Sequence, residues 1–201
     1  MDEKAFLCVS PWPEVYPSEQ HGAFEAQHIV AVAEGGVPLL WLALFREGDV
    51  RHGPAPVGTD DEREWVEAGA PVAGRERALA NLAAAGPALG RLFGPSVAAH
   101  AELLRQALQW FPDDWIMVEW WDGVRPVPPD PPDLRAALAA FDDPGQGPGA
   151  LLRLCRLDPG GLPDPPRPGA PLLPYLHEHA EPLRRLLGRA FDTLVPWEQP
   201  I

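Results

Sequence analysis

Apolar residues fall into two kinds of segment along this chain: short continuous runs, and longer stretches with helical spacing. The longest run, residues 39–45 (LLWLALF), follows Pro38 and is closed by the polar sequence REGD. A strand turns alternate side chains to opposite faces, so seven apolar residues in a row predict a central strand covered on both faces. Residues 115–121 (WIMVEWW) form a second apolar run, which we expect to be the neighbouring strand. The predicted architecture, and the binding hypothesis given below, depend on these two segments lying side by side.

Two further segments have the composition of strands. Residues 4–9 are mostly apolar and end at a Ser-Pro pair, while residues 27–33 lead through the sequence EGGV toward the run at 39–45. Two β-type segments joined by a short glycine-rich connection are typical of a hairpin, so we expect residues 27–33 and 39–45 to pair. Residues 150–157 give a weaker prediction of a strand. Residues 50–58, which contain glycine and proline, are expected to form a loop.

Five segments are predicted to be helical. Residues 59–62 (TDDE) have the form of a capping box, which predicts a short helix continuing through residue 67. Residues 75–93 and 96–111 carry apolar side chains at helical spacing, with a kink or break expected where Gly and Pro interrupt the first of them. Residues 131–141 and 181–191 each present one apolar face. The face of the last helix must be buried against the rest of the molecule or against a partner.

These elements predict an α+β protein with a mixed or antiparallel sheet of about four to five strands and helices packed on it. We expect residues 1–158 to form the core domain, residues 159–174 a connector, and residues 175–201 a C-terminal helix docking on the core. Fourteen of the 27 prolines lie between Pro126 and Pro174. This local excess is the reason that an extended connector is predicted there.

The net charge of −13 is unevenly distributed. Residues 1–70 contain 13 acidic and 4 basic side chains. Such a chain is unsuited to binding nucleic acid or anionic lipid, because both need clustered Lys and Arg. A basic protein partner is compatible with this charge, although acidic surfaces also serve solubility alone.

Composition and the chain start suggest the setting in which the protein works. Arginine outnumbers lysine fifteen to one, as a GC-rich coding sequence would give, and this indicates a bacterial source. The first residues lack the basic and apolar regions of a signal peptide. The longest apolar run is also far shorter than the ~20 residues that span a bilayer. We therefore expect a soluble, cytoplasmic protein.

The favoured functional hypothesis is a binding protein, such as an immunity-type protein or an inhibitor, that engages a basic partner through its acidic N-terminal third. The candidate contact residues are four acidic side chains and two tryptophans in polar, acidic surroundings: Asp60, Asp61, Glu62, Glu64, Trp65 and Trp12. Tryptophan is enriched at the energetic centres of protein interfaces, and complementary charge raises the association rate.

An enzyme is the alternative hypothesis. Glu119 lies within an apolar run, where a carboxylate has a raised pKa unless a cation or donor pairs with it, and such groups cluster at functional sites. It could act with His177 or His179, and a metal could assist. The simpler interpretation places Glu119 at a sheet edge and the two histidines in a polar loop. No catalytic residue, cofactor or metal site is assigned. Cys8 and Cys155 are expected to be buried, reduced thiols.

Overall fold

The computed structural model describes most of the chain. The described residues are 3–15, 27–57, 64–94, 96–122, 125–127, 131–142, 149–157, 178, 180–190 and 195. The predicted connector at 159–174, and the predicted site residues Asp60, Asp61, Glu62, His177 and His179, lie outside them.

The described strands form one antiparallel sheet. Its order is β3-β4-β5-β1-β2-β7, and β6 pairs with β5 beside this path. The predicted α+β class is therefore confirmed. The strands are β1 (Lys4–Ser10), β2 (His28–Glu34), β3 (Val50–Val57), β4 (Glu64–Gly74), β5 (Trp115–Asp122), β6 (Arg125–Pro126) and β7 (Arg189–Ala190).

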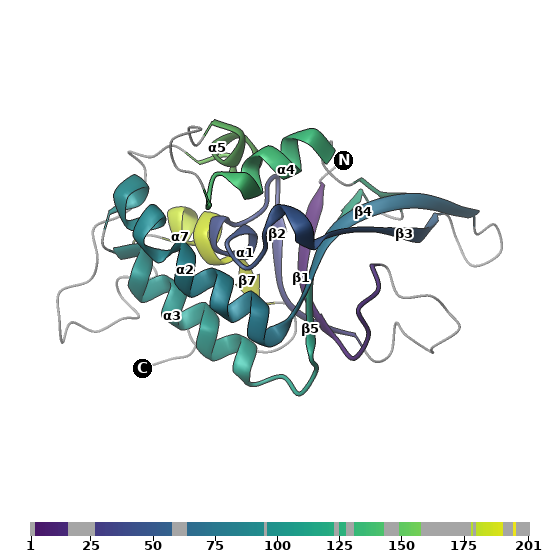
Figure 1. The fold of residues 1–201 in the computed structure, drawn as a ribbon, viewed down its shortest axis with the longest axis horizontal. Coiled ribbons are helices and arrows are strands. Elements are labelled where there is room, and N and C mark those ends of the chain that lie inside the picture. Colours follow the sequence, from purple (N-terminus) through teal and green to yellow (C-terminus); the bar gives the residue numbers. More distant parts are fainter. Residues whose placement is uncertain are drawn as a thin grey trace.

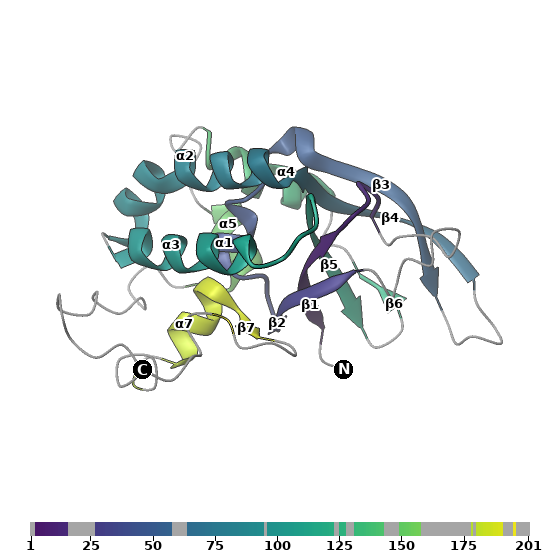
Figure 2. The same ribbon diagram turned by 90° about the horizontal axis from the view of Figure 1, so that it is seen from below.

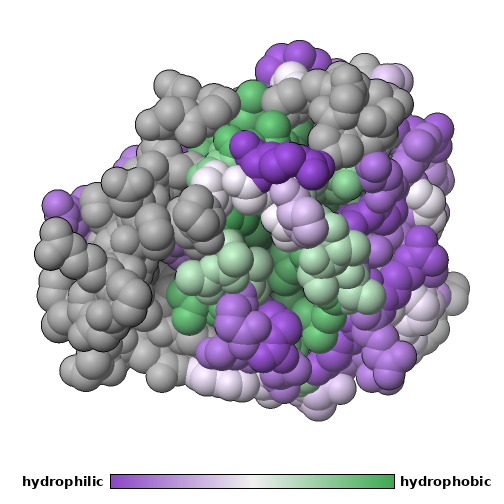
Figure 3. All heavy atoms as spheres, turned by 60° about the vertical axis from the view of Figure 1, so that its left-hand side comes forward, coloured by the Kyte–Doolittle hydropathy of each residue, from purple (hydrophilic) through white to green (hydrophobic). Residues whose placement is uncertain are grey.

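The helices gather on one side of this sheet, whereas the β3–β4 pair extends away on the other side (Figures 1 and 2). The described helical elements are α1 (Leu39–Leu42), the short 3₁₀ helix η3 (Glu47–Asp49), α2 (Arg75–Phe93), α3 (Ser96–Gln109), α4 (Pro131–Ala139), α5 (Gly149–Cys155) and α7 (Ala180–Leu187). Seen from the end where α2 leads into α3, hydrophobic side chains reach the surface in a hollow between hydrophilic ones (Figure 3). Among the described residues, no helix is both long and apolar enough to cross a membrane.

The centre of the sheet is the antiparallel pair β1 and β5. Leu7 lies opposite Val118, and Val9 lies opposite Ile116. All four are buried, and they form the inner face on which the helices pack. The predictions of strands at 4–9, 27–33 and 115–121 agree with β1, β2 and β5.

The predicted central strand at residues 39–45 is wrong. These residues form α1 and a following turn, although all seven side chains are buried. The backbone N–H of Trp41 donates to Pro38 O at 3.0 Å, and that of Ala43 donates to Leu39 O at 3.2 Å. A buried segment without a strand partner must satisfy its amides locally, which a helical turn does. Consequently β2 pairs with β1 and β7, and the hairpin predicted for residues 27–33 and 39–45 does not form.

Trp41 anchors the C-terminal elements on this buried turn. Its side chain is fully buried, and its Nε1 donates a hydrogen bond to the carbonyl of Leu187 at 2.8 Å. Gly188 ends α7 with φ +75°, and β7 then pairs with β2. The apolar face of α7, which includes Leu183 and Leu186, is buried, as its helical spacing requires.

A buried polar cluster holds the segment that follows the turn. Asp49 is 5 % exposed, and it accepts hydrogen bonds from the Arg46 backbone at 2.8 Å and from Asn81 Nδ2 at 3.3 Å. Its other oxygen lies 2.8 Å from Arg77 Nε. The Arg46 guanidinium donates to the carbonyls of Phe45 and Asn81. The cluster therefore ties η3 to α2, and it gives the buried carboxylate the cations and donors it needs.

Four other local predictions are corrected by the structure. Residues 50–57 form strand β3 and not a loop, and residues 64–67 begin strand β4 and not a helix. Residues 149–155 form helix α5, so the strand predicted at 150–157 is wrong. Helix α2 is continuous through Pro87. The side chain of Pro87 lies on the exposed face of the helix.

Candidate functional site

A two-stranded arm is the most exposed regular part of the described chain. Residues 64–71 of β4 pair only with β3, because β4 meets β5 only through Val72, Ala73 and Gly74. Burial changes sharply along β4, since residues 64–67 are exposed and Ala68 is buried. The outer part of β3 and β4 is therefore an antiparallel ribbon that leaves the body of the protein near Ala68 (Figure 1).

Prolines explain how β3 can form the outer edge of this arm. Pro54 and Pro56 stand two residues apart in the strand, so their nitrogens point to the same side. Proline cannot donate to a ladder, so this side must be the free edge, with β4 on the other. The same prolines keep another chain from adding a strand there. A partner of the arm must therefore be bound mainly through side chains.

The outer part of β4 exposes two large hydrophobic residues. Trp65 is 45 % exposed and Val66 is 39 % exposed, and they are flanked by the exposed acids Glu64 and Glu67. Trp110, at the end of α3, is the other large hydrophobic residue found exposed in the described chain, at 54 %. The sequence identified Glu64 and Trp65, but it assigned them to a helix and missed Val66 and Glu67. An alternation of apolar and polar residues could not identify Val66 and Glu67, because both faces of the ribbon are exposed.

Trp12 is only partly buried. Its segment runs along β3, where the Arg51 guanidinium donates to Pro13 O at 3.0 Å. Arg51 also stacks over the ring of Trp115, with its guanidinium carbon 5.0 Å from the ring centroid. The structure thus connects the neighbourhood of Trp12 to the arm that carries Glu64 and Trp65. It does not test whether any of these residues contacts a partner.

Glu119 is buried, although β4 pairs with β5 only as far as Met117, so the interpretation that leaves Glu119 in solvent at a sheet edge is wrong. It is 5 % exposed, and its strand lies between β1 and β4. Its carboxylate accepts hydrogen bonds from Gln27 Nε2 at 2.9 Å and from Trp121 Nε1 at 3.0 Å. Burial first, and then the Glu119 charge, raise the pKa of the neighbouring Cys8 thiol, while a hydrogen bond with Gln27 lowers it. These contacts fix the carboxylate in place.

Among the described residues, no constellation of catalytic side chains is identified around Glu119. His177 and His179 lie outside them, so the convergence that the enzyme hypothesis needs stays a prediction. Within the described ranges, no group of three or more His, Cys, Asp or Glu residues is placed to hold a metal ion. Cys8 and Cys155 are buried free thiols. Burial raises the pKa of both, which disfavours the reactive thiolate.

Comparison with known proteins adds no assignment to this geometry. No protein-family model, curated protein or solved structure matches the chain. Any function must therefore be inferred from the residues themselves.

Proposed function

We propose that this protein binds a basic protein partner through the arm formed by β3 and β4. The observation that carries the proposal is that Trp65 and Val66 are both exposed, one on each face of a ribbon that leaves the body of the protein. A projecting ribbon that exposes a large apolar side chain on each face suits a partner that encloses the ribbon. The binding hypothesis in its sequence-based form required a strand at residues 39–45 and fails with that strand; the present proposal is based on the arm instead.

The charge of the arm supports a basic partner. Residues 50–74 contain five acidic and two basic side chains, and three of the acids, Asp60, Asp61 and Glu62, belong to the connection between the two strands. Glu64 and Glu67 flank the apolar pair on β4 and are exposed. Apolar anchors surrounded by charge are the usual anatomy of an interface, with the anchors giving affinity and the charges steering the encounter.

An immunity-type or inhibitory role fits such an arm. A ribbon can enter a cleft of a basic toxin or enzyme and block it by occupancy, without any chemistry of its own. This role requires tight binding, which burial of one tryptophan and its neighbours in a pocket can provide.

Comparative capture from the source cell tests the proposal. Tagged wild type, Trp65→Ala and Trp110→Ala proteins are used in parallel, and bound proteins are quantified by mass spectrometry. We expect a basic protein that is retained by wild type and Trp110→Ala but lost by Trp65→Ala, since the Trp65 anchor costs about 2 kcal/mol or more when truncated. Equal capture by both variants contradicts the proposal.

Charge reversal on β4 gives a second, independent test of the proposed interface. The double variant Glu64→Lys, Glu67→Lys is expected to slow association with the captured protein, and the effect should shrink as salt is raised. The matched control reverses an acid far from the arm, Glu102→Lys on α3. An association rate unchanged by the arm variant would exclude Glu64 and Glu67 from the interface.

A further inference from the structure

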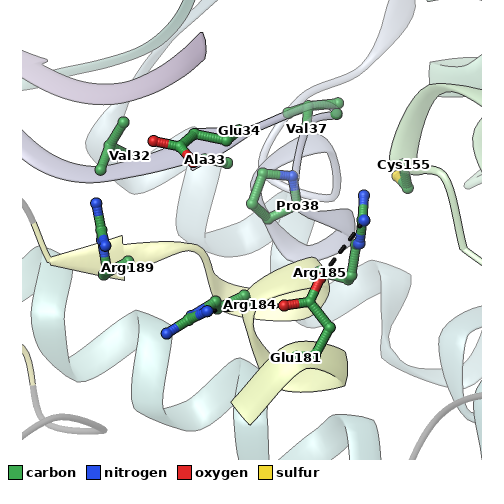
Figure 4. A pocket seen from close by; sticks show the side chains of 11 residues that line it. Val32, Ala33, Glu34, Val37, Pro38, Cys155, Glu181, Arg184, Arg185 and Arg189 are labelled. Atoms are coloured by element: carbon green, nitrogen blue, oxygen red, sulfur yellow. Dashed lines mark ion pairs between the residues drawn. The ribbon is translucent and has the colours of Figure 1, made fainter. Parts of the chain in front are cut away.

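A cavity of about 190 Å³ lies between β2, the turn that follows it and the C-terminal helix α7. One wall is apolar and comes from Val32, Ala33, Val37 and Pro38. The opposite wall carries three arginines, Arg184 and Arg185 from α7 and Arg189 from β7 (Figure 4). We propose that this cavity binds a small phosphate-type dianion through these three guanidinium groups.

The charge of the cavity is opposite to that of the chain. The protein carries a net charge of −13, yet the lining contains three arginines against the two acids Glu34 and Glu181. Glu181 is shared between two of the arginines, at 3.7 Å from Arg184 and 3.5 Å from Arg185. Both distances exceed those of well-formed charge-assisted hydrogen bonds, so these pairs hold the guanidinium groups only weakly.

Arg185 supplies the strongest indication of a missing acceptor. Its Nη1 atom is buried and has no hydrogen-bond partner within the described part of the chain. In Figure 4 the side chain of Arg185 lies between Pro38 and Cys155, and although the side chain as a whole is 33 % exposed, its Nη1 atom is buried. A buried donor on a charged group is costly to leave unpaired. An oxyanion in the cavity would provide the acceptor.

The scaffold holds the three arginines on two elements of fixed geometry. Gly188, in the left-handed region at φ +75°, reverses the chain after α7. Arg189 then pairs in register with Val32 of β2, so it faces the same cavity as the last turn of α7. Guanidinium groups match the oxygen geometry of phosphate, and the two elements bring three of them to one cavity.

A neighbouring cavity extends the positive region. It has a volume of about 320 Å³ and shares Gly36 and Val37 with the first cavity. Its cationic lining residues are Lys4, Arg153 and Arg156. Six of the 16 basic side chains of the chain thus surround one turn. The same two linings also contain the acids Glu3, Glu34 and Glu181, so six positive and three negative side chains leave a net charge of +3. This positive field favours a dianion over a singly charged ion.

Titration calorimetry at constant ionic strength tests the site, with inorganic phosphate and phenyl phosphate as probes and chloride as the reference anion. We expect both probes to bind the wild-type protein. Tighter binding of phenyl phosphate would identify a phosphate monoester, whose ring contacts the apolar wall, as the preferred form; equal or tighter binding of inorganic phosphate would identify free phosphate.

Variants decide whether the three arginines carry the binding. Arg185→Gln is expected to weaken phosphate binding by about tenfold or more, and Arg189→Gln, at an exposed strand position that tolerates substitution, should weaken it similarly. Glu181→Gln is expected to tighten binding by about twofold to fivefold, because it removes a competing acceptor. Arg105→Gln on α3 removes the same charge elsewhere and should leave the affinity unchanged.

Two results would overturn the site. The first is that the wild-type protein binds neither probe. The second is that Arg185→Gln and Arg189→Gln bind as tightly as wild type, or no more weakly than Arg105→Gln. Because the cavity shares no residue with the β3–β4 arm, Trp65→Ala should bind phosphate normally, so failure of one proposal leaves the other standing.

Discussion

Replacing Gly188 with alanine is expected to destabilise the protein through a collision with one identified ring. Gly188 has φ +75°, and a Cβ built on it would overlap Cζ2 of Trp41 and lie 3.0 Å from Cε2 of the same ring. Trp41 is fully buried, and its Nε1 donates to Leu187 O at 2.8 Å. The ring therefore cannot move away without losing this hydrogen bond.

The cost of Gly188→Ala has two parts. A residue with a Cβ in the left-handed region costs about 1 kcal/mol relative to glycine. Overpacking against the Trp41 ring adds about 1–3 kcal/mol, so the free energy of unfolding should fall by about 2–4 kcal/mol. Trp41→Phe alone should cost about 2–4 kcal/mol, because it leaves a cavity and an unpaired Leu187 carbonyl. In the Trp41→Phe background the collision disappears, and Gly188→Ala should cost only about 1 kcal/mol.

Urea denaturation of the two single variants, the double variant and wild type measures this coupling. The two changes should be non-additive by about 1–3 kcal/mol, the double variant being more stable than the sum of the single effects predicts. Trp110→Phe, at an exposed position, is the matched control and should combine additively with Gly188→Ala. Additivity within about 0.5 kcal/mol for Trp41 and Gly188 would refute the contact between them.

Three further perturbations test the fold. Asp49→Ala should lower the free energy of unfolding by about 2 kcal/mol, because it leaves the backbone N–H of Arg46 and the amide of Asn81 without their buried acceptor; a loss below about 1 kcal/mol in urea denaturation would contradict this. Arg156 is the one described non-glycine residue with positive φ, at 49°. Arg156→Gly should therefore raise the free energy of unfolding by about 1 kcal/mol, and a decrease would show that the Arg156 side chain is needed. Burial raises the pKa of Cys8 and Cys155 above the ordinary value of 9.0, so only the unfolded thiols ionise above that pH. The stabilisation from the two buried thiols is complete below pH 9. Above pH 9 the free energy of unfolding should fall by up to about 1.4 kcal/mol per pH unit for each cysteine. This fall should be shallower in Cys155→Ala, and equal slopes in the variant and wild type would count against the buried thiol.

The elements that the sequence predicted correctly are those whose local pattern has a single explanation. The apolar run at 115–121 is flanked by turn residues and rich in β-favouring side chains, and it forms β5. Helices α2, α3, α4 and α7 follow stretches in which apolar residues recur at helical spacing. In these cases propensity and burial favour the same structure.

The errors arise where a pattern has two solutions and long-range contacts choose between them. An apolar run of seven residues suits a buried strand or a buried helical turn, and at 39–45 the docking of α7 on Trp41 accompanies the turn. The capping-box sequence at 59–62 predicted a helix, but pairing with β3 makes a strand of the residues from Glu64 onward. Pro54 and Pro56 suggested a loop, although an edge strand accepts both.

The candidate sites likewise contain features that the sequence alone identifies and features that depend on long-range pairing. Glu64 and Trp65 could be selected from the sequence, because an acidic neighbourhood around a tryptophan is a local property. Their position on a projecting ribbon could not, since it depends on pairing β4 with β3. The sequence also could not predict that the three arginines line one cavity, because Arg189 joins Arg184 and Arg185 only when β7 pairs with β2.

Photo-cross-linking from the arm is the decisive test of the proposed binding function. A benzoylphenylalanine residue is placed at position 66 in one protein and at position 110 in another, and both are irradiated in the source cell. We expect a discrete adduct with a basic protein from position 66, none from position 110, and loss of the adduct when Glu64 and Glu67 are changed to lysine. No discrete adduct at position 66, or the same adduct at both positions, would contradict binding through the arm.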